Sequence, residues 1–98
     1  MEKTDLEYTV YWTDRSDENL KDIWHFIALD SEEKADQFLE ELIDAGGWLN
    51  KLPFRHPKYH QDSSSYILTH KGYQIIYEVI ETSVNILTIN NMQLFKKK

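Results

Sequence analysis

The chain has 98 residues, enough for one hydrophobic core, and we expect a single domain over residues 1–98. Cysteine is absent, which excludes disulfides, thiolate nucleophiles and cysteine metal sites. No run approaches the roughly 20 apolar residues needed to cross a bilayer, and the first residues lack the pattern of a signal peptide. We therefore expect a cytoplasmic protein without a membrane partner.

The net charge of −6 is unevenly distributed along the chain. Residues 1–44 contain 14 acidic and four basic side chains, whereas residues 45–98 contain three acidic and seven basic ones. The first part should repel polyanions and the second could attract them. The alternative is that the acidic part only keeps the domain soluble. A dedicated nucleic-acid-binding domain would normally be basic throughout, and this chain is not.

The first predicted elements are a strand over residues 7–13 and a helix that begins within residues 13–16. Alternation places Tyr8, Val10 and Trp12 on one face of the strand. The helix ends at Asp30 and Ser31. Its apolar stripe, at spacings of three and four residues, consists of Leu20, Ile23, Trp24 and Ile27.

A second helix is predicted from Ser31, its N-cap, to the residue before Pro53. Its apolar phase continues through Leu49 and Leu52, so we expect one helix that bends at Gly46–Gly47. A true break at the glycines is the alternative. The paired carboxylates Glu40–Glu41 are predicted to face solvent.

The remaining sequence predicts a loop followed by three strands. Residues 53–62 have two prolines and no periodicity, and residues 65–70 form the next strand. Lys71–Gly72 is a two-residue turn in which Gly72 supplies a positive φ. The last two strands, up to Ile80 and over residues 84–89, flank the turn 81–83. This order, β-α-α-β-β-β, predicts an α+β domain with two helices packed on one face of a mainly antiparallel sheet.

Several short motifs occur in a characteristic order along the chain. A strand ending in Tyr11-Trp12-Thr13 precedes the helices, Leu49-x-x-Leu52-Pro53 follows them, and Tyr73-x-Ile75-x-Tyr77 lies in the hairpin. In order and spacing, from residue 8 to residue 89, the chain resembles the RelE/ParE family of toxins from type II toxin–antitoxin, or plasmid stabilisation, systems. The resemblance implies that the first strand pairs with the last.

One branch of that family cleaves messenger RNA on the ribosome, and it typically has an arginine where this chain has Gln74. Phosphodiester cleavage needs an acid, a base and cations that stabilise the phosphate. The remaining candidates for these roles are His70 and Tyr77 as acid or base, and Lys71 and Arg55 as phosphate clamps. Each also has a structural interpretation, Tyr77 as a core aromatic and His70 as an ordinary strand-end side chain.

The ParE branch, which the chain resembles slightly better, acts by binding DNA gyrase and needs no catalytic arginine. We therefore expect a toxin that acts by binding rather than as an enzyme. Two alternatives stay open: a ribosome-dependent messenger RNA endoribonuclease with a depleted site, and a non-toxic interaction module. The resemblance also implies a cognate antitoxin as a partner. The expected assembly is either a toxin homodimer or a toxin–antitoxin hetero-oligomer. Its contact with the first helix should be basic, opposite Asp17, Glu18 and Asp22.

Other binding candidates gather in and before the loop. Trp48 lies off the apolar stripe and is either an interface anchor or part of the core. The loop has the densest cationic and aromatic composition of the chain, and loops often carry function. The full set of predicted binding residues beside those of the first helix is Trp48, Arg55, His56, Lys58, His60 and Gln74. His56 and His60 have Pro57 between them and no well-spaced third ligand, so no metal or cofactor is predicted.

Overall fold

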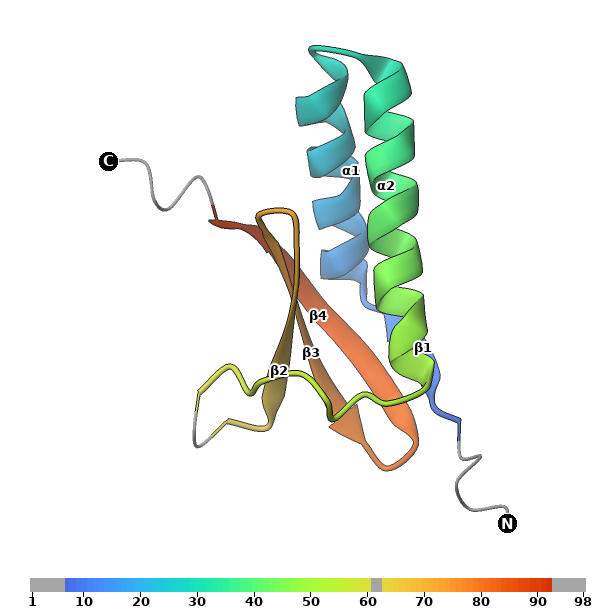
Figure 1. Ribbon diagram of the computed structural model, residues 1–98, viewed down its shortest axis with the longest axis vertical. Helices are drawn as coiled ribbons and strands as arrows, with labels where there is room; N and C mark the ends of the chain where they lie inside the picture. Colours follow the sequence, from blue (N-terminus) through green and yellow to red (C-terminus); the bar gives the residue numbers. More distant parts are fainter. Residues whose placement is uncertain (1–6, 61–62, 93–98) are drawn as a thin grey trace.

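The computed structural model describes residues 7–60 and 63–92. Figure 1 shows two antiparallel helices standing beside a twisted sheet. This architecture confirms the predicted α+β class and element order. The elements are β1 (Thr9–Trp12), α1 (Asp14–Ala28), α2 (Glu32–Gly47), the 3₁₀ helix η2 (Trp48–Asn50), β2 (Ser65–His70), β3 (Tyr73–Ile80) and β4 (Ser83–Asn91).

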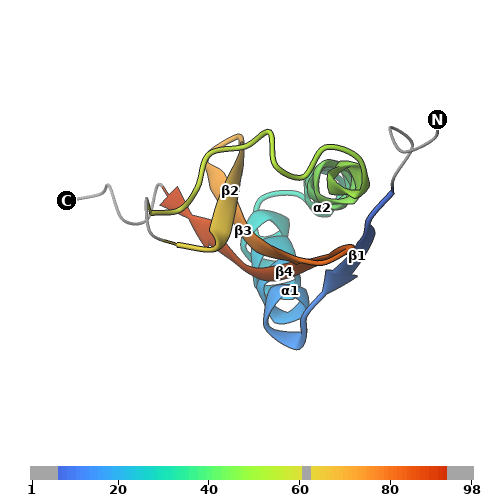
Figure 2. The ribbon, with the colours of Figure 1, turned by 90° about the horizontal axis from the view of Figure 1, so that it is seen from below.

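The four strands form one mixed sheet in the order β1-β4-β3-β2, which Figure 2 shows across the view. β1 is parallel to β4, and the other two pairs are antiparallel. The pairing of the first strand with the last is therefore confirmed. β1 is shorter than the predicted strand over residues 7–13, because the Tyr8 amide donates instead to the Asn50 carbonyl of η2.

Both hairpins turn through left-handed backbone conformations. Lys71 and Gly72 have φ values of 47° and 88°, so the predicted positive φ at Gly72 is confirmed. Between β3 and β4 the turn has two residues rather than the expected three, and Glu81 adopts a φ of 55°. β4 also continues to Asn91, beyond the predicted end at Ile89.

The core lies on the face of the sheet that the helices cover. A register shift between Ile76 and Tyr77 keeps the apolar residues of β3 and β4 on the same face, on either side of the irregularity. The buried residues of this cluster are Ile23 from α1, Leu42 from α2, Leu49 from η2, Tyr73, Ile75 and Tyr77 from β3, and Val84, Ile86 and Ile89 from β4.

α1 also lies along the part of β4 that β1 does not reach. β1 pairs with β4 only as far as Ile86. Beyond that point the Oδ1 atom of Asn19 accepts hydrogen bonds from the Ile89 amide at 2.8 Å and the Thr88 hydroxyl at 2.9 Å. The side chain of Asn19 thus takes the place of a strand partner, and α1 completes the edge of the sheet.

The end of α2 differs in detail from the expected single helix through residue 52. α2 continues through Gly46, ends at Gly47, and leads directly into the 3₁₀ turn η2. Leu49 is buried, whereas Leu52, which continues the same apolar phase in the sequence, is 66% exposed. The tighter 3₁₀ winding rotates residues after Gly47 away from the α-helical phase.

Candidate functional site

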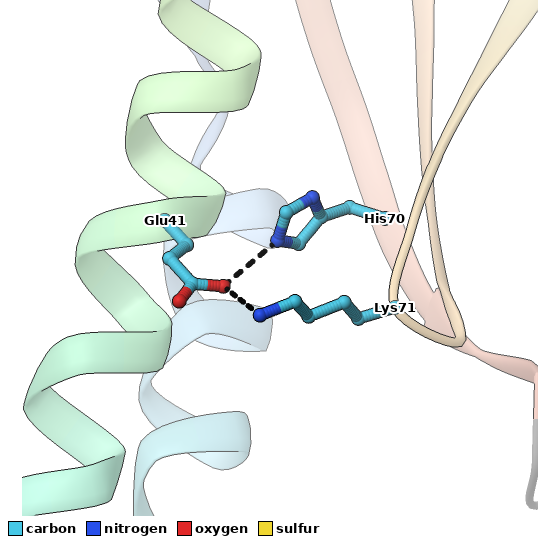
Figure 3. A network of polar contacts seen from close by, with 3 residues as sticks. All are labelled: Glu41, His70 and Lys71. Carbon is cyan, nitrogen blue, oxygen red and sulfur yellow. Dashed lines mark hydrogen bonds and ion pairs between the residues drawn. The ribbon is translucent and has the colours of Figure 1, made fainter.

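The tip of the β2–β3 hairpin is joined to α2 by a three-residue cluster, Glu41, His70 and Lys71 (Figure 3). One oxygen of the Glu41 carboxylate lies 3.0 Å from His70 Nε2 and 2.9 Å from Lys71 Nζ. Hydrogen bonds from His70 and then Lys71 lower the pKa of the Glu41 carboxyl below its ordinary value. The Glu41 side chain is 41% exposed, as expected of a solvent-facing carboxylate, but it also has two intramolecular partners that the sequence did not predict. Local sequence held no signal for this contact, since Glu41 lies 29 residues from His70.

Two of the four predicted catalytic candidates, His70 and Lys71, belong to this cluster. The His70 ring also lies beside Phe38, with centroids 5.9 Å apart, and Phe38 in turn contacts Tyr73 at 5.2 Å. His70 and Lys71 therefore share an intramolecular carboxylate. Chemically, the arrangement fastens the hairpin tip to the helix.

Tyr77 lies in the core. Its side chain is fully buried, stacks on Tyr66 at 5.6 Å, and donates a hydrogen bond from its hydroxyl to the Pro53 carbonyl. Burial, and to a smaller extent Tyr66, raises the pKa of the Tyr77 hydroxyl far above its ordinary value. A neutral hydroxyl without solvent access cannot exchange protons with a substrate, so its role as an acid or base is withdrawn. Its structural interpretation as a core aromatic is the correct one.

Gln74 lies on the face of the sheet opposite Tyr73 and Ile75. It is paired across the ladder with Thr69 on β2 and Asn90 on β4. This row of the sheet is therefore neutral and polar. A phosphate at this position could receive hydrogen bonds from Gln74 but no charge compensation.

The predicted loop residues are spread out rather than gathered at the hairpin tip. His56 lies edge-on to Tyr77 with ring centroids 6.4 Å apart, and burial followed by the nearby Arg55 charge lowers the pKa of its imidazole. Lys58 forms a backbone bridge with Tyr66 at the edge of β2, and the His60 ring lies 4.4 Å from that of Tyr59.

A third group, Arg55, His56 and Trp48, lines a cavity beside η2. Trp48 is 71% exposed there, which agrees with the interface-anchor interpretation rather than with a place in the core. Within residues 7–60 and 63–92, no three His, Asp or Glu side chains gather closely enough to hold a metal ion.

The acidic residues predicted to face an antitoxin are exposed on α1. Asp17 borders a groove between α1 and α2 whose apolar lining includes Leu20, Trp24, Leu39 and Ile43. Asp22 borders a second hollow between α1 and the end of β4, and Glu18 is exposed on α1. Asp17 and Asp22 therefore border apolar surface.

Phe26, 60% exposed, is a surface residue that sequence patterns missed. It lines the hollow beside Asp22. The available signal was its position outside the stripe formed by Leu20, Ile23, Trp24 and Ile27. A large apolar side chain on the polar side of an amphipathic helix indicates a binding surface.

Neither α1 nor α2, the long helices of the described part of the chain, has an apolar stretch that could span a lipid bilayer.

Comparison of the sequence with protein families finds a match. The family described as the ParE toxin of the type II toxin–antitoxin system parDE matches residues 10–93. A search of curated proteins finds no match.

Solved structures share the fold at low sequence identity. The chromosomal ParDE toxin–antitoxin system from P. aeruginosa has a chain 18% identical, with a TM-score of 0.77 over 89% of this chain and 98% of that one. The toxin–antitoxin complex RelBE2 from Mycobacterium tuberculosis has one 19% identical, with a TM-score of 0.66 over 87% and 98%. YafQ from E. coli strain BL21(DE3) is 11% identical, with a TM-score of 0.51 over 92% and 99%.

Proposed function

Because this chain belongs to the ParE family of toxins from type II toxin–antitoxin systems, we propose that it acts by binding a bacterial protein target, such as DNA gyrase. In this proposal it works in the cytoplasm, contributes to plasmid stabilisation, and is neutralised by a cognate antitoxin. The toxin damages the cell by occupying its target rather than by cleaving a bond.

The observation that carries the proposal is the contact of Glu41 with both His70 and Lys71, at 3.0 and 2.9 Å. An RNA-cleaving site needs its acid, base and cations directed at the scissile phosphate. Here the imidazole and the ammonium group share a carboxylate of their own chain. A phosphate approaching the hairpin tip would have to displace Glu41, whose negative charge repels it.

Two other residues support the same interpretation. Gln74 offers hydrogen bonds but no charge, and Tyr77 is buried with its hydroxyl bonded to Pro53. Of the candidate residues for RNA cleavage, all but Arg55 are therefore neutral, buried or paired. Binding of a protein target requires none of them.

The antitoxin is expected on the helices. Apolar side chains between α1 and α2 offer a groove for the apolar face of a partner helix, and Asp17 lies at its edge together with Lys21 and His25. The partner is a protein segment that places basic residues opposite Asp17, Glu18 and Asp22. Solved relatives that contain an antitoxin, the ParDE and RelBE2 assemblies, support this expectation.

The experiment that tests the mode of action is brief induction of this gene alone in a bacterial host, with labelled thymidine and labelled methionine followed over the first minutes. We expect DNA synthesis to fail first, and purified protein to inhibit supercoiling by gyrase. Early failure of protein synthesis would contradict the proposal in favour of messenger RNA cleavage. Continued growth would identify a non-toxic interaction module.

A conservative variant sharpens this test. His70→Gln keeps a donor for Glu41 but removes a titratable group. A toxin that acts by binding should remain fully active with this change, whereas a nuclease that uses His70 as acid or base should lose about a hundredfold or more of its activity. Loss of toxicity in a folded His70→Gln protein would therefore count against binding as the mechanism.

A further inference from the structure

A separate surface lies where α2 ends, and we call it the η2 pocket. It is a cavity of about 330 Å³ lined by Trp48, Leu52, Arg55 and His56 among others. This volume is at the lower end of the range of ligand pockets, roughly 300–1,000 Å³. Two of its apolar side chains are largely exposed, Trp48 at 71% and Leu52 at 66%.

The exposure of these side chains follows from the way the chain is fastened. Pro53 is buried, and its carbonyl accepts the hydrogen bond from Tyr77. Leu52 and Phe54, on either side of this buried anchor, are both more than half exposed. Because Pro53 is held in the core, the apolar side chains of its two neighbours are left exposed to solvent. An apolar patch that folding leaves uncovered is typical of an interaction site.

The charge of the pocket is opposite to that of most of the molecule. Arg55 and Lys51 both line it, and Lys51 lies 3.6 Å from Glu7. In the part of the chain that the structure describes, no carboxylate lies within ion-pair distance of Arg55. Burial lowers the pKa of His56, so at neutral pH its imidazole is uncharged and can both donate and accept hydrogen bonds.

We propose that the η2 pocket binds an acidic peptide segment of a partner protein. A carboxylate of the segment pairs with Arg55, and a large apolar side chain next to it fills the cavity against Trp48 and Leu52. This inference stands on the pocket alone and does not depend on the toxin's mode of action.

A peptide fits the pocket better than a nucleic acid does. Binding along a phosphate backbone requires several cations at once. Among the described residues, only two lysine or arginine side chains line the pocket, and one of them, Lys51, already lies close to Glu7. The net charge of −6 would also repel a polyanion. The aliphatic side chain of Leu52 matches an apolar side chain better than it matches a base.

Fluorescence anisotropy of the full chain with a defined probe tests the proposal. The probe is a fluorescein-labelled peptide in which one leucine and one phenylalanine stand between glutamates. Its control has glutamine at every glutamate position, and a labelled oligouridylate represents nucleic acid. Emission from Trp48, isolated by comparison with Trp48→Phe, should shift to shorter wavelength when an apolar side chain covers the indole.

We expect the glutamate peptide to bind and the glutamine peptide to bind about tenfold or more weakly. Both Arg55→Gln, which removes the charge, and Arg55→Glu, which reverses it, should weaken binding of the glutamate peptide by about tenfold or more. Lys34→Glu, a charge reversal on an exposed face of α2, should have no effect. Circular dichroism checks that each variant is folded. Equal binding of both peptides, no effect of either Arg55 variant, or tighter binding of oligouridylate through Arg55 would each overturn the proposal.

Discussion

Gly46 of α2 packs closely against the indole of Trp12 on β1. An ideal Cβ placed on it would lie 2.6 Å from Cζ2 and 2.7 Å from Cη2 of the Trp12 indole. This rigid planar ring, which packs against the core, cannot move aside as a flexible side chain can. The glycine that appears from sequence to weaken a helix is therefore required for the packing of that helix on the sheet.

Gly46→Ala should lower the free energy of unfolding by about 1–2 kcal/mol, because the overlap with Trp12 outweighs the better helix propensity of alanine. Chemical denaturation measures the change. Gly47→Ala is the matched control, since a Cβ there meets nothing within 4 Å. It should leave stability unchanged or raise it by up to about 1 kcal/mol. Equal effects of the two substitutions would show that Trp12 does not limit the approach.

Tyr77 offers a second test at the residue scale. Tyr77→Phe removes the hydrogen bond to Pro53 and leaves that carbonyl with one partner fewer in a buried position. We expect a loss of about 1–2 kcal/mol in the free energy of unfolding. Tyr66→Phe, in the ring that stacks on Tyr77, should cost far less, since no hydrogen bond of its hydroxyl is found among the described residues. An unchanged melting temperature for Tyr77→Phe would contradict the structural role assigned to the hydroxyl.

At the scale of elements, α1 and the loop before β2 supply hydrogen bonds to the sheet that a neighbouring strand would usually supply. α1 satisfies the β4 backbone through Asn19 where β1 has ended. The loop before β2 covers the opposite edge, where the Tyr59 amide donates to the Ser65 carbonyl and the Ile67 amide to the Pro57 carbonyl. These contacts satisfy backbone groups of β4 beyond β1 and of the first half of β2, which would otherwise be open to pairing with another chain.

The cluster that joins the hairpin tip to α2 should make stability depend on pH. Because the pKa of Glu41 is lowered in the folded protein, its stabilising effect is present above the ordinary carboxyl pKa of 4.5 and is lost as pH falls through the folded value. Melting temperature against pH should therefore fall more steeply below about 4.5 in the wild type than in Glu41→Gln. Glu40→Gln, at the next and exposed position, is the control. Parallel curves for wild type and Glu41→Gln would exclude this contribution.

Across the whole molecule, charge divides the surface by function. Asp17 borders the groove between α1 and α2 and Asp22 borders the hollow beside β4, while Lys51 and Arg55 line the η2 pocket. The net charge of −6 therefore conceals two surfaces that should favour partners of opposite charge.

Reversal of charge on α1 should weaken the antitoxin complex. The double variant Glu18→Lys and Asp22→Lys changes two exposed residues one helical turn apart, and we expect about a tenfold loss of affinity, which high salt should reduce. Glu40→Lys with Asp44→Lys makes the same change on α2 as a control. Titration calorimetry with the cognate antitoxin measures both. Equal affinities would mean that the antitoxin does not contact this face of α1.

Features with local causes were predicted well. The stripe of α1, the Ser31 cap and the Lys71–Gly72 turn depend on residues within a few positions of one another, and the structure contains all three. The pairing of β1 with β4 came from the family resemblance, because nothing in the β1 sequence specifies its partner. The single helix predicted up to the residue before Pro53 was too long, because helical phase was extended past the point where η2 begins.

The sequence by itself determined the helices, the hairpins, the family and the excess of acid in the first part of the chain. Only the tertiary structure decided which side chains are available. It paired Glu41 with His70 and Lys71, placed the Tyr77 hydroxyl in the core, and set Trp48 beside Arg55. Periodicity and turn chemistry act over a few residues, whereas ionic and hydrogen-bonding partners are chosen across contacts between elements distant in the chain.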